Sequence, residues 1–155
     1  MTDFFALLDE ARAAAIDVNA LKQKFHQRAR NEHPDVADGA GFEKLNAAYR
    51  TLADPKLRLA HLLELNGATT AHIDQPPADL VDLFFATSVA LNQAQRGDRT
   101  AAEMQLRNIG KLRAATVASL SEINVNDVAA ARGAHQRLSF YDRWIEQLLE
   151  ATVRA

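Results

Sequence analysis

The fold of the N-terminal part of the chain is decided by one stretch, Asn31-Glu32-His33-Pro34-Asp35-Val36-Ala37-Asp38-Gly39-Ala40-Gly41. Pro34 cannot continue a helix and disfavours helical geometry at His33, so a helix must end here. A second amphipathic segment begins at Phe42. Because the connection is short, the two flanking helices must pack antiparallel, and His33-Pro34-Asp35 lies at their tip. Taken alone, this tripeptide can be a simple turn, so the residues that flank it must show whether it also has a function.

The helix before the tip is predicted at residues 18–32, with Asp17 as its cap. Its apolar face is thin and consists of Leu21, Phe25 and Ala29. The other faces carry four basic residues and one acidic residue, namely Lys22, Lys24, Arg28, Arg30 and Glu32. This helix therefore has a charge of +3, although the whole chain has a net charge of −2. Such a face is either merely solvated or attracts an acidic partner over roughly 8 Å at physiological salt.

Helical patterns also cover the rest of the N-terminal part. The first helix is predicted at residues 3–14, with Asp3 or Thr2 as its cap. A third helix is predicted at residues 41–52, with an apolar seam formed by Phe42, Leu45, Tyr49 and Leu52. Asp54-Pro55 provides a cap and a first-turn proline for a fourth helix, which ends at Asn66-Gly67.

The C-terminal half predicts a helical bundle. Residues 68–76 have the composition of a linker, and three helices follow at residues 77–95, 99–121 and 126–152. Their short connections indicate an up-down-up arrangement. The predicted fold is all-α, with a four-helix N-terminal domain at residues 1–67, the linker, and a three-helix bundle at residues 77–155.

Composition excludes several functional classes. The net charge argues against a general nucleic-acid or membrane-surface binder, and the absence of cysteine excludes disulfides, thiolate nucleophiles and Cys-ligated metal sites. His26, His61, His72 and His135 lack metal-ligand spacing, so no metal or other cofactor is expected. No nucleophile–base pair is apparent, which predicts a protein that is not an enzyme. The first residues lack the basic start of a signal peptide and no apolar run reaches membrane-spanning length, so a cytoplasmic location is expected.

The flanks of the tip carry a family resemblance. It rests on Leu21, Phe25, His33-Pro34-Asp35, Leu45-Asn46, Ala48-Tyr49, Leu52, Asp54-Pro55 and Arg58. In this order they resemble a J-domain, the module that recruits DnaK-type chaperones. The resemblance implies that Lys22 and His33-Pro34-Asp35 bind such a chaperone. Departures from the family pattern at His26, Gln27, Arg28 and Glu32 imply a basic surface that is weaker or displaced toward Arg28 and Arg30.

The resemblance extends to one J-domain family, the HscB iron–sulfur co-chaperones. It rests on the stretch Arg58-Leu59-Ala60-His61-Leu62-Leu63-Glu64-Leu65-Asn66-Gly67, on Leu138-Ser139-Phe140-Tyr141-Asp142-Arg143, and on the layout of J-domain, linker and bundle. The resemblance implies a DnaK- or HscA-type partner and a client, an iron–sulfur scaffold protein, bound by an apolar patch on the bundle. By position that patch comprises Leu80, Val81, Phe84 and Phe140. Acidic residues of the family are replaced by Phe85 and Ser88, so this patch is expected to be more apolar, with Phe85 included.

The helix pattern supports an apolar patch independently. Two apolar stripes run along residues 80–91: one consists of Leu80, Leu83, Phe84, Thr87 and Leu91, the other of Val81, Phe85 and Val89. One stripe suffices for a three-helix core. The second is either a client-binding surface or buried against the rest of the chain. Alternatively, the bundle serves a different client, or only dimerisation or structural support.

Overall fold

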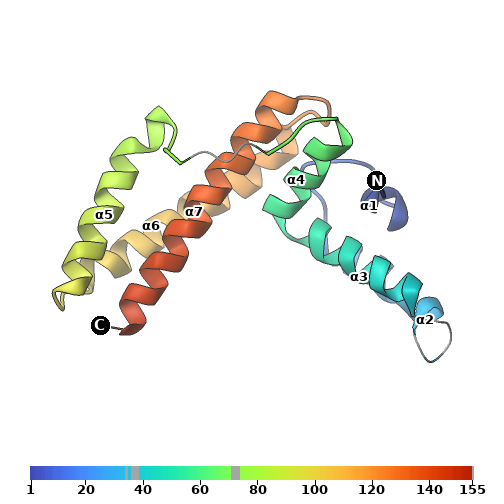
Figure 1. The fold of residues 1–155 in the computed structure, drawn as a ribbon, viewed down its shortest axis with the longest axis horizontal. Coiled ribbons are helices and arrows are strands. Elements are labelled where there is room, and N and C mark those ends of the chain that lie inside the picture. Colours follow the sequence, from blue (N-terminus) through green and yellow to red (C-terminus); the bar gives the residue numbers. More distant parts are fainter. Residues whose placement is uncertain (34, 36–38, 71–73, 155) are drawn as a thin grey trace. The chain divides into compact units, whose positions relative to one another are not determined.

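The computed structural model describes the chain except residues 34, 36–38, 71–73 and 155. The elements among the described residues are helices, so the predicted all-α class is confirmed (Figure 1). In chain order they are α1 (Phe4–Leu7), α2 (Val18–Glu32), α3 (Ala40–Ala53), α4 (Pro55–Leu65), η1 (Ala78–Leu80), α5 (Val81–Gln95), α6 (Thr100–Ser119), η2 (Leu120–Glu122) and α7 (Val128–Arg154). No helix in the described part of the chain is both long and apolar enough to cross a membrane.

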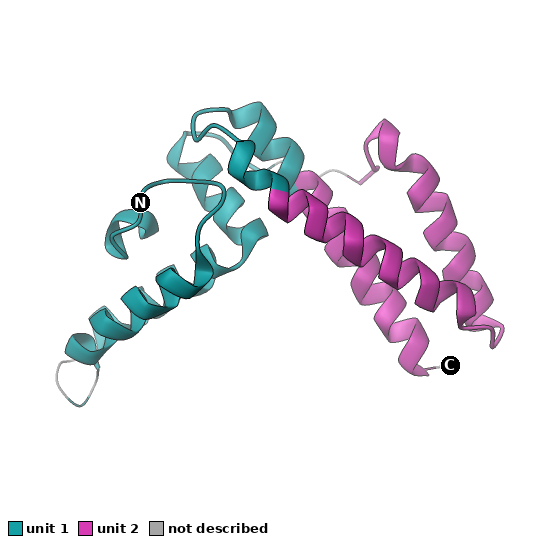
Figure 2. Cartoon of the chain, turned by 180° about the vertical axis from the view of Figure 1, so that it is seen from behind, with its two compact units in different colours: residues 1–70, 119–135 teal, residues 71–118, 136–155 magenta. Residues whose placement is uncertain are grey.

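The chain forms two compact units (Figure 2). The first contains residues 1–70 and 119–135, and the second contains residues 71–118 and 136–155. The segment 119–135 joins the first unit because Leu120 and Ala131 are buried and the Asn66 side-chain amide donates a hydrogen bond to the Val125 carbonyl at 2.9 Å. The predicted domain boundaries at residues 67 and 77 treat each domain as one continuous stretch of the chain. They did not anticipate that residues 119–135 return to the first unit. They stay a prediction.

In the first unit, α3 packs against α1, α2 and α4 (Figure 1). An aromatic cluster joins α2 to α3, with the Phe25 ring stacked on Tyr49 at 4.7 Å between centroids and 6.4 Å from Phe42. Leucines from three helices fill the remaining core, namely Leu21, Leu45, Leu52, Leu59, Leu62 and Leu63. This core fixes the base of the tip between α2 and α3.

Side-chain caps set the helix boundaries that the sequence predicts. The Asp17 carboxylate accepts hydrogen bonds from the backbone N–H groups of Asn19 and Ala20, so α2 begins and ends as predicted. The Asp54 carboxylate caps α4 in the same way, directly before Pro55. Each such cap is worth about 1 kcal/mol. Gly67 has φ 71°, the left-handed geometry that ends a helix after Asn66.

The predicted length of the first helix is wrong. Asp3 caps it as expected, but α1 ends at Leu7 instead of continuing to residue 14. Asp9 adopts a left-handed φ of 53°, and the Glu10 N–H donates to the Phe5 carbonyl at 2.8 Å, which closes the helix. The helix stops because the residues after it contact other elements: Asp9 and Glu10 bind α2, and the Ala14 carbonyl accepts a hydrogen bond from Arg58.

Arg58 is a buried cation that connects three parts of the first unit. Its Nε donates to the Ala14 carbonyl at 2.7 Å and its Nη1 donates to the Leu52 carbonyl at 2.6 Å. Burial lowers the pKa of Arg58 and Asp54 opposes this shift, but a guanidinium stays protonated in proteins. The side chain therefore satisfies two backbone acceptors at the cost of desolvating a charge.

The second unit contains the bundle helices α5, α6 and α7, although the first turns of α7 belong to the first unit (Figures 1 and 2). Its buried core consists of Leu80, Ala90, Ala94, Ala102, Ile109, Phe140, Tyr141, Trp144 and Leu148. Polar contacts tie the helices together at the edge of this core. Arg113 pairs with Asp142, Arg137 pairs with Asp79, and the Gln105 amide donates to the Thr87 hydroxyl at 3.1 Å.

Candidate functional site

The tip presents His33 and Asp35 beyond the end of α2. His33 has extended backbone geometry, which ends the helix, and its ring lies edge-on to Phe42 with 5.7 Å between centroids. The Asp35 side chain is 87% exposed and its carboxylate lies 3.2 Å from His33 Nδ1. The Asp35 N–H also points at Nδ1, at 3.3 Å. A ring nitrogen without a hydrogen accepts from the N–H, and one that carries a hydrogen donates to the carboxylate, so these two contacts are alternatives. Pro34 lies outside the described residues.

The basic residues of α2 fall into two groups. Lys22 and Arg30 are exposed, and no described residue forms an ion pair with either. Arg28, in contrast, donates two hydrogen bonds to the Asp9 carboxylate at 2.5 and 3.2 Å, and Lys24 contacts the Glu10 carboxylate at 2.9 Å. The expected basic surface at Lys22, Arg28 and Arg30 is therefore not uniform.

Sequence reasoning missed the two carboxylates beside α2. Asp9 and Glu10 were expected inside the first helix, where they would have had no defined relation to Arg28 or Lys24. The available signal was a pair of acidic residues close to the start of a strongly basic helix. Only the left-handed turn at Asp9 brings them to it.

An apolar patch lies on α5. Phe84 and Phe85 are 39% and 60% exposed, Val81 is half-buried, and Val89 further along the helix is 55% exposed. The two phenylalanine rings meet edge to face at 5.5 Å. The second stripe of α5 is therefore not buried within the bundle, and it provides the accessible apolar area that a partner could cover.

Two of the five predicted client-binding residues belong to the core instead of the surface. Leu80 and Phe140 are 5% and 4% exposed. The Phe140 ring packs 5.5 Å from Trp144, which in turn lies 6.5 Å from Phe84, and the Arg143 guanidinium covers Phe140. Phe140 is thus linked to Phe84 only through Trp144, and it exposes little area of its own.

Comparison with known proteins gives a near full-length match. A co-chaperone protein HscB homolog from Bordetella avium is 29% identical over 94% of this chain and 95% of the relative. The chain is HscB-like. Two solved structures share its fold: human HscB, with a TM-score of 0.75 and 17% identity over 100% of this chain and 84% of that chain, and HscB from Vibrio cholerae, with a TM-score of 0.75 and 19% identity over 99% of both chains. No protein-family model matches the sequence.

Other relatives resemble only part of the HscB-like chain. Chaperone protein DnaJ 2 from Streptomyces albus G is 32% identical over 113 residues, which are 64% of this chain and 28% of that protein. Chaperone protein DnaJ from Prochlorococcus marinus is 40% identical over 62 residues, 37% of this chain and 16% of that protein. This chain thus spans between 16% and 38% of the length of these and other DnaJ proteins that it matches.

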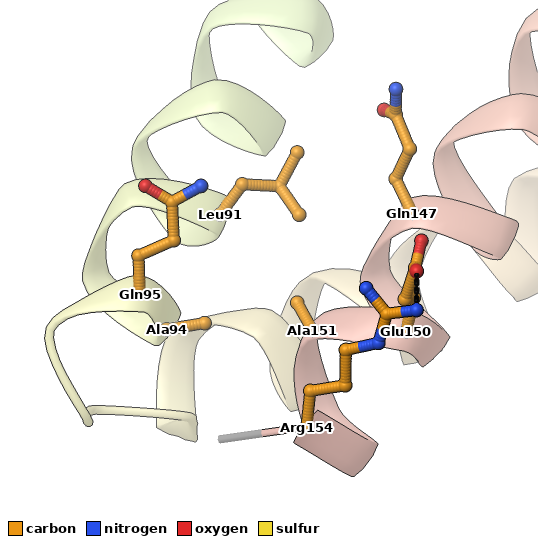
Figure 3. Close-up of a pocket in the computed structure, with 7 residues that line it drawn as sticks. All are labelled: Leu91, Ala94, Gln95, Gln147, Glu150, Ala151 and Arg154. Carbon is orange, nitrogen blue, oxygen red and sulfur yellow. Dashed lines mark ion pairs between the residues drawn. The ribbon is translucent and has the colours of Figure 1, made fainter.

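The HscB-like bundle also contains a cavity of about 480 Å³ between the C-terminal turns of α5 and α7 (Figure 3). It is lined by Leu91, Ala94, Gln95, Gln147, Glu150, Ala151 and Arg154. Its only charged side chains, Glu150 and Arg154, form an ion pair at 2.7 Å. The lining contains no serine, threonine, cysteine, histidine or lysine that could form a nucleophile–base pair with Glu150. Among the described residues, no group of three His, Asp or Glu side chains could hold a metal ion.

Proposed function

We propose that this chain is a co-chaperone that links a DnaK- or HscA-type chaperone to an iron–sulfur scaffold protein. The tip between α2 and α3 recruits the ATP-dependent chaperone and stimulates its ATPase. The patch on α5 holds the scaffold protein. The chain itself catalyses no reaction. Its effect is to raise the concentration of one partner at the other.

The chaperone-binding end is supported by the placement of His33 and Asp35. Both side chains reach solvent beyond a rigid pair of helices, and the exposed Asp35 carboxylate can accept a bidentate hydrogen bond from an arginine of the partner. The likeness to an HscB homolog over nearly the whole of both chains is the observation that carries the proposal.

The client-binding end is supported by the exposed rings of Phe84 and Phe85. Aromatic residues at the centre of an interface supply much of its binding energy. Val81 extends the patch, while Leu80 and Phe140 are buried in the bundle core. We assign recognition of the scaffold protein to the three outer residues and positioning to the two inner ones.

The chaperone-binding end is tested by the ATPase rate of a purified DnaK-type chaperone with and without this chain. We expect His33→Gln to remove the stimulation while changing the free energy of unfolding by no more than about 0.5 kcal/mol, because the residue is half-exposed and outside the core. His26→Gln makes the same chemical change at an exposed position of α2 and should leave stimulation intact. Full stimulation by His33→Gln would contradict the proposed function.

A different client, or self-association of the bundle, is favoured by one further observation. Val89 on α5 and Met104 on α6 are both more than half exposed and border a hollow of about 350 Å³ between the two helices. Sedimentation of the full chain over a range of concentrations separates the alternatives. A dimer that Met104→Gln dissociates would assign this face to self-association, whereas a monomer at all concentrations supports a separate client.

A further inference from the structure

The turn after α1 places two carboxylates on one flank of the basic helix α2. The Asp9 carboxylate accepts both hydrogen bonds of Arg28, and the Asp9 backbone carbonyl accepts a hydrogen bond from Lys24 Nζ at 2.9 Å. The Glu10 carboxylate lies 2.9 Å from the same Lys24 nitrogen. We call these four residues the acidic clamp: Asp9, Glu10, Lys24 and Arg28.

The clamp covers one flank of α2 and leaves another open. Lys24 and Arg28 are four residues apart and share one face, beside the turn that follows α1. Lys22 and Arg30 are eight residues apart, about 12 Å along the helix, and both lie on another side of α2, which is solvent-exposed. We call Lys22 and Arg30 the open pair. The helix that carried a charge of +3 by sequence has a charge of +1 once the two clamp carboxylates are counted with it.

The backbone geometry at Asp9 indicates that its carboxylate has a role beyond ending the helix. A helix that ends in left-handed geometry usually does so at glycine, because glycine has no Cβ to strain. Here the position is occupied by Asp9, with φ 53°. The aspartate closes α1 less readily than glycine would, but only aspartate brings a carboxylate to Arg28. Both members of that ion pair are well exposed, so the pair adds little to the stability of the fold.

We propose that the acidic clamp withdraws Lys24 and Arg28 from the surface offered to an acidic partner, so that Lys22 and Arg30 determine recognition along α2. This inference rests on the proposed function, because the acidic partner is taken to be the DnaK-type chaperone. The clamp acts as a specificity device. It lowers the attraction of α2 for anions in general and leaves Lys22 and Arg30 as the exposed cations without an ion pair among the described residues.

The chaperone arm of the test uses variants of the full chain in which charged side chains are replaced by neutral amides. Lys22→Gln with Arg30→Gln removes the open pair, Asp9→Asn with Glu10→Gln releases the clamp cations, and all four clamp substitutions (Asp9→Asn, Glu10→Gln, Lys24→Gln, Arg28→Gln) remove the clamp without changing net charge. Asparagine tolerates the left-handed geometry of Asp9, so the variants are expected to fold. Circular dichroism and thermal melting check this before binding is measured.

We expect loss of the open pair to weaken binding to the ATP-bound chaperone about tenfold, chiefly through the association rate. Release of the clamp cations should strengthen binding about threefold to tenfold at low salt, whereas removal of the whole clamp should leave it within about twofold. The differences should shrink at about 1 M salt, where charges act over only about 3 Å. The inference is overturned if removing the whole clamp weakens binding as much as removing the open pair, or if releasing the clamp cations changes nothing.

A second arm replaces the chaperone with poly-L-glutamate, a plain acidic polymer, and uses the same variants. The same order of affinities is expected, because the clamp acts on the charge of α2 itself. If wild type neither binds nor stimulates the chaperone but the order holds on poly-L-glutamate, the proposed function fails and the clamp stands. If His33→Gln abolishes stimulation but the clamp variants show the wrong order on both partners, the clamp fails and the proposed function stands.

Discussion

The tip and the α5 patch achieve exposure in opposite ways. His33 and Asp35 stand outside the core, directly after the last turn of α2. Phe84 and Phe85 lie on a helix whose other face is the core, and Phe84 reaches Trp144 directly. Charged side chains at the tip can therefore be replaced with little loss of folding stability, whereas the patch residue Phe84 also packs against the bundle core. Function and stability should separate cleanly at the tip and only partly at the patch.

The largest expected effect is on stability and concerns the aromatic support of each surface. Phe25→Ala and Phe140→Ala should each lower the free energy of unfolding by about 3–5 kcal/mol, because both remove a buried ring and leave a cavity. Denaturant titration with far-UV circular dichroism measures this. Phe84→Ala is the matched control and should cost less than about 1 kcal/mol. A loss of under about 1 kcal/mol for Phe140→Ala would contradict its assignment to the core.

The next effect is on binding to a purified iron–sulfur scaffold protein. Phe84→Ser combined with Phe85→Ser should weaken binding at least tenfold, about 1.4 kcal/mol, because two exposed rings leave the interface. Calorimetric titration measures the affinity, and Met104→Gln on α6 serves as the control. Changing Phe140 together with Phe84 would not be informative, because loss of the core would lower binding for a different reason. Equal losses for the control and the double variant would argue against a patch centred on α5.

A smaller effect concerns pH and the first unit. The Phe4 N–H donates to Nε2 of the buried His61 at 3.1 Å, which requires the neutral ring. Burial lowers the pKa of His61, and the nearby Asp3 and Glu64 oppose this shift, whereas Arg12 adds to it. The unfolded chain therefore takes up a proton that the folded chain resists. The stabilisation is complete above the ordinary histidine pKa of 6.5 and is lost as the pH falls below it.

Unfolding curves between about pH 8 and pH 5 should show this loss, since histidines titrate in that range. His61→Gln should reduce the slope, because the glutamine is not protonated. Part of the slope should remain, because burial and Lys56 also lower the pKa of His135. A slope unchanged by His61→Gln would show that the contact between α1 and α4 does not depend on the neutral ring.

The smallest expected effect lies at the base of the tip. A Cβ added to Gly41 would lie 2.0 Å from Glu32 Oε2. In a Glu32→Ala background, Gly41→Ala should stabilise the chain by about 0.5–1 kcal/mol through helix propensity. With Glu32 present, most of that gain should disappear because its carboxylate must move. A double-mutant cycle measures the coupling, and additive effects would show that Glu32 does not occupy this space in solution.

Much of the fold could be predicted because its boundaries are local. Asp17, Asp54-Pro55 and Gly67 are signals that act within one turn of the helix they start or end. The end of α1 could not be predicted in this way. No glycine or proline marks it, and the contacts that stop the helix come from α2 and from Arg58.

The candidate surfaces show the same limit. Charge counted along α2 ignores what a neighbouring segment places beside it, so Arg28 was grouped with Arg30. Spacing along α5 identified two apolar stripes correctly, but periodicity cannot say which residues of a partner helix lie beneath them. Phe140 was therefore assigned to the surface by position in the family pattern, although it fills the core.

Arg58 has a consequence for how the first unit comes apart. Its two backbone acceptors, Ala14 and Leu52, belong to segments that are distant in the sequence. If either segment detached, a guanidinium would be left in an apolar interior with half of its partners gone, which is strongly unfavourable. Partial unfolding is therefore unfavourable whether it begins at the segment of Ala14 or at the segment of Leu52. The segment before α2, the end of α3 and α4 should consequently lose amide-exchange protection together, as one cooperative block.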